Sequence, residues 1–257
     1  MARVLVTGSA DGLGQMAARL MVAAKHRVVL HARNGDRASD ALAAVPGAET
    51  VVVGDLSSIR ETRDVADQVN GLGAFDAIIH NAGIGYRERR RGEKLEGLPL
   101  VFAVNTLSTY ILTALINKPK RLVYLSSGMH RGGDSSLRDL VWKERPCNGS
   151  SAYADTKLHD AILAFAVARK WPDVLSNAVE PGWVPTKMGG PGAPDSLDDG
   201  PKTQVWLATS EEPGAKVSGH YFFHMKRRGA DPAASTESVQ ERLLGECARL
   251  SGIPFPN

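Results

Sequence analysis

The chain has 257 residues, of which 43% are hydrophobic and 23% are charged, close to ordinary globular usage. Its 31 basic and 28 acidic side chains leave a formal net charge of +3, too weak a bias to indicate nucleic-acid binding. No run approaches the roughly 18 apolar residues that a membrane span needs, and no leader-like segment precedes the first strand, so we expect a soluble, cytoplasmic protein without a membrane span.

Short apolar runs alternate with segments of helical spacing along the chain. The apolar runs predict strands at 3–8, 27–33, 49–56, 75–83, 120–128, 174–184 and 217–224. The helical spacing predicts helices at 14–26, 36–45, 58–72, 95–116 and 150–171. Because such strands are buried on both faces, we predict a single α/β domain over residues 1–257, with a doubly wound, seven-stranded parallel sheet and helices on both faces.

The end of the first strand carries a glycine-rich turn, TGSADGLG at residues 7–14, and a helix follows it. Glycines at such a turn let the chain bend tightly, let a pyrophosphate approach the backbone and let helix and strand pack closely. The free N–H groups and positive dipole end of the helix would face the phosphates. The turn therefore predicts a dinucleotide site formed by Gly8, Ser9, Asp11, Gly12, Leu13 and Gly14.

The second strand ends at Ala32 and Arg33, where the adenosine ribose lies in a dinucleotide-binding fold. No carboxylate stands there to bind the 2′-OH of NAD or to repel a 2′-phosphate. The Arg33 guanidinium can bind such a phosphate, and the less favoured alternative is a solvated cation at a strand end. We predict that NADP(H) is preferred and that NAD(H) is possible, since Asp11 adds no positive charge to the turn.

The segment SSAYADTKLHD at residues 150–160 places Tyr153 four residues before Lys157 on a predicted helix. Residues four apart share one helix face, about 5–6 Å apart at Cβ. An ammonium ~4 Å from a phenolate could lower the phenol pKa by up to ~3 units at an effective dielectric constant near ~20. The pair could then work as a general acid–base near neutral pH, although such a pair alone is more often an ordinary surface feature.

Six motifs follow one another in the sequence: TGSADGLG, HNAG at 80–83, the Asn of FAVN at 102–105, YLSS at 124–127, YADTK at 153–157 and PGWVPT at 181–186. Together they closely resemble the short-chain dehydrogenase/reductase family over about residues 3 to 225. The stretch from LRDLVWKERPCNGSSAY (137–153) to SGHYFFH (218–224) looks most like the branch that includes retinol dehydrogenases. The resemblance implies a Rossmann domain whose bound nicotinamide exchanges a hydride with a carbonyl/alcohol substrate.

The resemblance also implies roles for the matching residues. Tyr153 would exchange a proton with the substrate oxygen, and Lys157 would lower the pKa of Tyr153 and hold the nicotinamide ribose. Ser127 would bind the substrate carbonyl beside the structural Ser126, and Asn105 would fix a water that relays protons to Lys157. The other implied cofactor contacts are Asp55 and Leu56 at the adenine, Asn81, Ala82 and Gly83 at the ribose, and Pro181, Gly182, Val184 and Thr186 at the carboxamide.

Two positions depart from the family pattern, and neither change removes a reacting group. His80 stands where the family has Asn, and Thr156, which keeps a hydroxyl, stands where it has Ser. The basic run RERRR at 87–91 is interpreted as a solvated loop at the mouth of the site, with contact to an acidic substrate or phosphate as the alternative. The Gly- and Pro-rich segment at about 187–201 is expected to be a loop and a substrate lid.

The partners are less readable from the sequence. Trp183 and Met188 flank the nicotinamide end and favour a small, largely apolar carbonyl or alcohol substrate, although core packing explains them equally well. The histidines show no metal-ligand spacing, so no metal site is expected, and Cys147 and Cys247 read as free thiols. The helices at 95–116 and 152–171 could form a homodimer face, or pack on the sheet.

Two other functions compete with an oxidoreductase. A catalytically silent nucleotide-binding regulator could use the same fold, but the intact set of Ser127, Tyr153 and Lys157 disfavours it. An α/β-hydrolase would need a Gly-x-Ser-x-Gly turn, which the sequence lacks.

Overall fold

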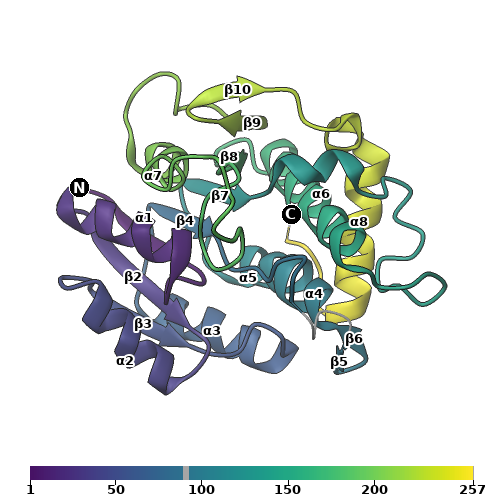
Figure 1. The fold of residues 1–257 in the computed structure, drawn as a ribbon, viewed down its shortest axis with the longest axis horizontal. Helices are drawn as coiled ribbons and strands as arrows, with labels where there is room; N and C mark the ends of the chain where they lie inside the picture. The colour runs from purple at the N-terminus through teal and green to yellow at the C-terminus, as the bar shows by residue number, and fades with distance from the viewer. Residues whose placement is uncertain (89–92, 257) are drawn as a thin grey trace.

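The computed structural model describes residues 1–88 and 93–256, and their centre is one eight-stranded sheet in the order β10-β9-β8-β7-β4-β1-β2-β3 (Figure 1). Its seven parallel strands are the seven that the sequence predicts, so the doubly wound sheet is confirmed. They are β1 (Arg3–Val6), β2 (Arg27–Ala32), β3 (Thr50–Val53), β4 (Ala77–His80), β7 (Arg121–Leu125), β8 (Leu175–Glu180) and β9 (His220–Phe223).

The eighth strand, β10 (Lys226–Arg228), was not predicted. It pairs antiparallel with β9 through a tight turn at His224 and Met225, which both have positive φ. Two-residue hairpin turns with positive φ usually carry Asn or Gly, so this turn has no recognisable signal in the sequence.

Helices cover both faces of the sheet, as predicted (Figure 1). A hydrophobic core lies on each face of the sheet, because successive strand side chains point to opposite faces. In β1, Val4 and Val6 pack into one core and Leu5 into the other. The first face carries α1 (Gly12–Ala23), α2 (Gly35–Ala44) and α7 (Lys202–Thr209). The second face carries α3 (Ile59–Gly71), α4 (Leu100–Phe102), α5 (Ser108–Leu115), α6 (Gly149–Lys170) and α8 (Glu237–Ser251).

The prediction of one helix over 95–116 is wrong at its start. A short hairpin, β5 (Lys94–Leu95) and β6 (Leu98–Pro99), precedes the helix, because Glu96 and Gly97 both adopt positive φ and turn the chain. The helix begins at Leu100, and its second part is a π-helical turn, η1 (Ala103–Leu107), before α5 continues it. Such turns are often found at functional sites.

Helices α7 and α8 were also missed. The buried side chains of α8 include Gln240, Leu243, Leu244 and Cys247, a spacing that predicts a helix packed by one face, and Gly252 ends it in the left-handed conformation. Two short 3-10 turns, η2 (Gly128–Gly132) and η3 (Pro232–Ser235), complete the fold. No helix in the described part of the chain has both the length and the apolar character to cross a membrane.

Two expectations concern loops. The segment 187–201 contains no helix or strand, as predicted. Most of the basic run at 87–91 lies outside the described residues, so its interpretation stays a prediction.

Candidate active site

The predicted site residues gather at one edge of the sheet, where the parallel strands end. The turn at 7–14 follows β1, residues 81–83 follow β4, Ser126 and Ser127 follow β7, and residues 181–186 follow β8. Open α/β sheets bind ligands in the crevice outside these carboxyl ends. The structure therefore brings together segments that are far apart in the sequence.

The glycine-rich turn is shaped by close packing and left open at its tip. A Cβ on Gly14 would lie 2.4 Å from the Asn81 Nδ2 atom and 2.6 Å from the Gly8 carbonyl oxygen, so only glycine fits there. Gly12 has a φ of +56° and nothing within 4 Å of a Cβ position. It begins α1, whose first turn has no side-chain cap. The turn fits the pyrophosphate of a dinucleotide.

His31 holds this turn against the sheet, a role that no motif in the sequence indicated. Its Nδ1 atom accepts a hydrogen bond from the Gly8 N–H at 3.0 Å, so the ring donates from Nε2 to the Gly54 carbonyl at 3.0 Å. Burial lowers the pKa of His31 to about 4, which keeps the ring neutral. Ser9 is fully buried, and its hydroxyl accepts from the His31 N–H at 2.9 Å. The Ser9 side chain thus binds β2.

Thr7 and Asn81 tie the ends of β1 and β4 together. The Thr7 hydroxyl accepts from the N–H groups of Asn81 and Ala82, each at 3.0 Å. The Asn81 side-chain amide donates to the carbonyls of Thr7 at 2.9 Å and Gly8 at 3.1 Å. Asn81 therefore contacts the glycine-rich turn directly, and Thr7 is a further site residue that was not predicted.

Charged side chains surround the expected adenosine end. Arg33 is exposed just after β2, and among the described residues its guanidinium has no hydrogen-bond or ion-pair partner. Asp11 pairs with Arg37 at 3.0 Å and with Lys187 at 3.1 Å. Asp55 accepts two bonds from Ser57. Beside Asp55 lies the buried side chain of Leu56, whereas Leu13 at the start of α1 is half-buried.

Helix α6 carries Tyr153 and Lys157 on one face, as predicted. The Tyr153 ring is buried, its hydroxyl lies 3.8 Å from the Met188 sulfur, and the edge of Tyr86 packs against it with centroids 5.8 Å apart. The Lys157 Nζ atom lies 5.7 Å from the centre of the Tyr153 ring. It donates to the Leu125 carbonyl at 2.7 Å, and to a carboxylate on its own helix.

That carboxylate belongs to Asp160, which was not predicted to be near the site. Its Oδ2 atom lies 2.8 Å from the Lys157 Nζ atom, and both side chains are buried. Burial raises the pKa of Asp160 to about 6, against the opposing effect of Lys157. Burial lowers the pKa of Lys157, but Asp160 and Tyr153 outweigh it and hold that pKa above its usual value.

The electrostatics of Tyr153 differ from the expectation. Burial raises the pKa of the phenol above its usual value and outweighs Lys157, which lowers it. Asp160 adds to the rise, while the hydroxyl of Ser127 opposes it. The expectation that Lys157 brings the phenol towards neutrality is wrong for this structure, because it considered neither the loss of solvation nor the carboxylate beside the lysine.

The two serines after β7 face different partners. The Ser126 hydroxyl donates to the Lys157 carbonyl at 2.7 Å and is buried. Ser127 is half-buried, and its hydroxyl accepts from the Met129 N–H at 3.2 Å. The same hydroxyl lowers the pKa of Tyr153 through a hydrogen bond. Ser126 therefore anchors α6 to the sheet, and Ser127 is the serine beside the phenol.

Asn105 lies in the π-helical turn and is fully buried. Its Oδ1 atom accepts from the Ile84 N–H at 2.8 Å, and its Nδ2 atom donates to the Ile84 carbonyl and the Thr156 hydroxyl, each at 3.0 Å. Gly83 lies between Asn105 and Lys157, since a Cβ there would be 3.5 Å from Oδ1 and 3.6 Å from Nζ. Asn105 thus borders the expected ribose position, and both its N–H groups have protein partners.

The segment after β8 folds over the phenol. Val184 is buried, and the Thr186 hydroxyl accepts from the Gly189 N–H at 3.2 Å. The Trp183 ring donates to the Gly189 carbonyl at 3.0 Å while half of its surface stays exposed. Pro181 and Gly182 are half-buried at the strand end. These contacts hold Met188 beside Tyr153.

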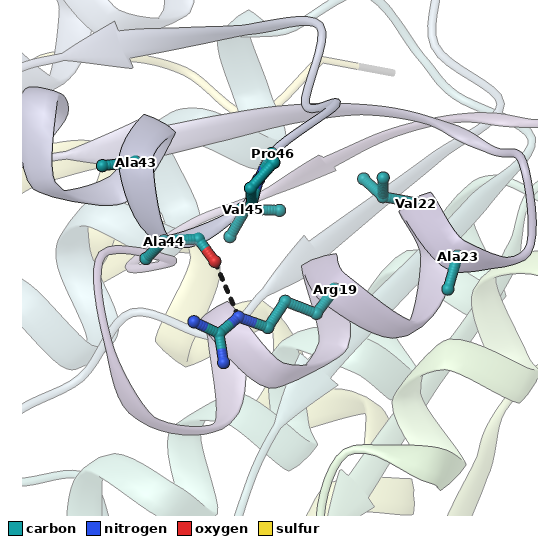
Figure 2. A pocket seen from close by; sticks show the side chains of 7 residues that line it. All are labelled: Arg19, Val22, Ala23, Ala43, Ala44, Val45 and Pro46. Atoms are coloured by element: carbon teal, nitrogen blue, oxygen red, sulfur yellow. Dashed lines mark hydrogen bonds between the residues drawn. The ribbon is translucent and has the colours of Figure 1, made fainter.

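A separate hollow of about 460 Å³ lies at the opposite ends of α1 and α2. Figure 2 shows its lining, in which the Arg19 Nε atom donates to the Ala44 carbonyl at 2.7 Å. Because these residues stand near the C-termini of both helices, the hollow lies away from the glycine-rich turn. It shares no residue with the candidate site.

Known proteins are similar in sequence to this chain along its whole length. The family described as short chain dehydrogenase matches residues 2–124. An uncharacterized oxidoreductase of Emericella nidulans is 46% identical over 100% of this chain and 99% of its own. Short-chain dehydrogenase chry4 of Gibberella zeae is 42% identical over the whole of both chains. Human retinol dehydrogenase 13 is 29% identical over 99% of this chain and 86% of its own.

Solved structures show the same fold. An uncharacterized protein from Mycobacterium paratuberculosis superposes with a TM-score of 0.85 over 100% of this chain and 96% of its own, at 23% identity. An alcohol dehydrogenase from the archaeon Thermococcus sibiricus, complexed with 5-hydroxy-NADP, gives 0.65 over 88% and 96%, at 19% identity.

Proposed function

This chain belongs to the short-chain dehydrogenase family, and from that premise we propose that it prefers NADP(H) and uses Tyr153 as the acid–base of its reaction. As a family member it is an NAD(P)-dependent oxidoreductase of CH–OH or C=O groups. The observation that carries the proposed chemistry is that Ser127, Tyr153 and Lys157 lie together at the sheet edge where the glycine-rich turn also stands.

The nicotinamide cofactor, when bound, supplies or accepts the hydride, and the protein binds, orients and moves the proton. The glycine-rich turn would hold the pyrophosphate, because Gly12 and the start of α1 leave their backbone open. Arg33 would bind a 2′-phosphate, since it is exposed and free of other described partners at the end of β2. The complex of the Thermococcus sibiricus relative with an NADP analogue is consistent with this preference.

The proton would pass between the Tyr153 hydroxyl and the substrate oxygen. Because burial raises the pKa of Tyr153, the hydroxyl is protonated at neutral pH and is set to donate. Ser127 lies beside it and would hydrogen-bond the same oxygen, whereas Ser126 is bound to the Lys157 carbonyl. We therefore expect the rate of carbonyl reduction to be high at neutral pH, and the rate of alcohol oxidation to rise at alkaline pH.

The substrate would enter between Tyr86 and Met188, which both contact the Tyr153 ring or its hydroxyl. These walls favour a small, largely apolar carbonyl or alcohol compound. Because the Met188 sulfur occupies the space beside the hydroxyl, the segment 187–201 would have to move for a substrate to reach Tyr153, which supports its role as a lid. A cytoplasmic location and a homodimer stay predictions.

The test of the proposed chemistry is Tyr153→Phe. It removes one hydroxyl from a buried ring, so we expect turnover with NADPH to fall at least ~100-fold on every carbonyl substrate found in a ketone and aldehyde screen. The dissociation constant of NADPH should stay nearly unchanged.

Tyr110→Phe is the matched control, because Tyr110 is also a buried tyrosine but donates to the Ile253 carbonyl, outside the site. Wild-type turnover by the Tyr153→Phe protein would contradict the proposal. No observation favours a silent regulator, and a protein that binds NADPH without turning over any substrate in the screen would revive that alternative.

A further inference from the structure

The catalytic lysine candidate has a buried carboxylate one helical turn away. Asp160 follows Lys157 by three residues on α6, and its Oδ2 atom accepts from the lysine Nζ atom at 2.8 Å. The exposed fraction of the side chain is 6% for Lys157 and 4% for Asp160. Few charge pairs lie so fully inside a protein, and each partner needs the other because an unpaired charge is costly to bury.

Two hydrogen bonds fix the ammonium group. The Lys157 Nζ atom donates to the Leu125 carbonyl at the end of β7 and to Asp160, so two of its three N–H groups are engaged. Beside the same atom stands Gly83, which has no side chain to cover it. In the part of the chain that the structure describes, the third N–H has no further acceptor, so it can meet a bound ligand.

We propose that Asp160 is a positioning residue that holds the Lys157 ammonium beside Tyr153 and sets how strongly its charge acts on the Tyr153 hydroxyl. This rests on the proposed function for the role of Tyr153, whereas the effect on Lys157 does not. The family motifs that identify Tyr153 and Lys157 end at residue 157, so they do not include Asp160.

The neighbours of Asp160 determine the sign of the effect. On α6, it faces Lys157 and acts on Tyr153, and from β7 it faces Tyr124, whose pKa is raised by burial and by Asp160. The ring of His80 on β4 lies beside that of Tyr124, tilted by 30° and with centroids 4.9 Å apart, and burial lowers the pKa of His80 to about 3, so it is neutral. Lys157 is therefore the only cation among these groups. Removing the carboxylate should lower the pKa of both Lys157 and Tyr153.

The experiment compares Asp160→Asn with the wild type. The amide keeps the shape and an oxygen acceptor for Lys157 but loses the charge. The matched control is Asp155→Asn, because Asp155 is equally buried on α6 but pairs with Arg145 at 2.7 Å and lies outside the proposed machinery. Asp160→Glu keeps the charge and should restore the wild-type behaviour.

The first measurement needs neither cofactor nor substrate. In protein labelled with ¹³C at the lysine ε-carbons, and with Lys157→Arg used to assign the signal, the Lys157 resonance should titrate at lower pH in Asp160→Asn. It should titrate unchanged in Asp155→Asn. Identical titration in the wild type and Asp160→Asn overturns the proposal. Should Asp160→Asn fail to fold, Asp160→Ser removes the same charge with a smaller side chain.

The second measurement is the pH dependence of turnover in alcohol oxidation. The acid limb should move to lower pH in Asp160→Asn by about one unit, the size expected for a buried charge several ångströms away. An unmoved limb, with an unmoved lysine titration, shows that Asp160 serves only packing. A shifted lysine titration in a protein without oxidoreductase activity would retain the positioning of Lys157 and refute the proposed function, so the two failures are distinguishable.

Discussion

The two ends of the site are formed by different kinds of side chain. At the adenosine end, the glycine-rich turn is held by neutral groups. His31 and Asn81 bind its backbone, the hydroxyl of Thr7 binds the N–H groups of Asn81 and Ala82, and α1 starts without a side-chain cap. At the catalytic end, a buried ammonium, a carboxylate and a phenol act on one another. The first end therefore depends on shape, and the second on charge. Substitutions that change volume should damage the first most, and substitutions that change charge the second.

The largest effect on the adenosine end is expected from Gly14→Ala. The added Cβ would lie 2.4 Å from the Asn81 Nδ2 atom and 2.6 Å from the Gly8 carbonyl oxygen, so α1 and β4 must separate. We expect the free energy of unfolding to fall by about 1–3 kcal/mol. We also expect weaker binding of the dinucleotide. Urea unfolding and NADPH fluorescence titration measure the two effects.

Gly245→Ala serves as its control, because Gly245 lies inside α8 with nothing within 4 Å of a Cβ position. Alanine there should stabilise the helix by about 0.5–1 kcal/mol. If Gly14→Ala binds NADPH as tightly as the wild type, the adenosine end does not depend on shape in the way we describe.

A smaller effect is expected from removing a charge at the adenosine end. Arg33→Ala should remove most of the preference for NADPH over NADH, a change of about 10-fold, because bonds to charged groups contribute about 1.5–3 kcal/mol and Arg33 is exposed. Dissociation constants of both cofactors give the ratio. Arg37→Ala is the comparison, since Arg37 is engaged by Asp11 and Asp40. An Arg33→Ala protein that discriminates like its parent would refute the assignment.

The smallest effect concerns the neutral state of His31. Its pKa is about 4 in the folded protein because of burial, below the ordinary 6.5. As the pH falls below 6.5, His31 is protonated more in the unfolded chain than in the folded protein. The stability that the neutral ring contributes is therefore lost progressively between a pH of 6.5 and a pH of about 4. Between about pH 7 and about pH 6 this loss should be under about 1 kcal/mol for this residue.

The measurement is the free energy of unfolding at both pH values for the wild type and His31→Gln. The variant lacks the titrating ring, so its stability should depend less on pH than that of the wild type. Since His80 and His159 are also buried with a pKa of about 3, they contribute equally to both proteins. An equal pH dependence in the two proteins would mean that His31 is not the neutral anchor of the turn.

The same contrast explains how much the sequence could predict. The seven parallel strands, the glycine-rich turn and the Tyr153–Lys157 spacing follow from local patterns, because each depends on neighbours a few residues apart. The part played by His31 was not predictable, since its partners Gly8 and Gly54 lie 23 residues away on either side. Asp160 did carry a signal, three residues after a lysine on a helix, but that spacing equally describes an exposed pair, and its burial depends on the whole fold.

The π-helical turn Ala103–Leu107 rotates the helical residues of the site relative to the core residues that follow it in α5. Each residue of a regular helix turns the chain by about 100°, so the wider turn changes the phase between the helical residues before it and those after it. Asn105 faces Ile84 and Thr156, while Tyr110 and Thr113 of α5 face the interior. In a regular α-helix of the same residues, only one of these sets could keep its direction. Because a π turn holds one residue more than an α turn, deleting one residue here would leave a regular helix in which α5 keeps its direction, while Asn105 would lose its place between Ile84 and Thr156.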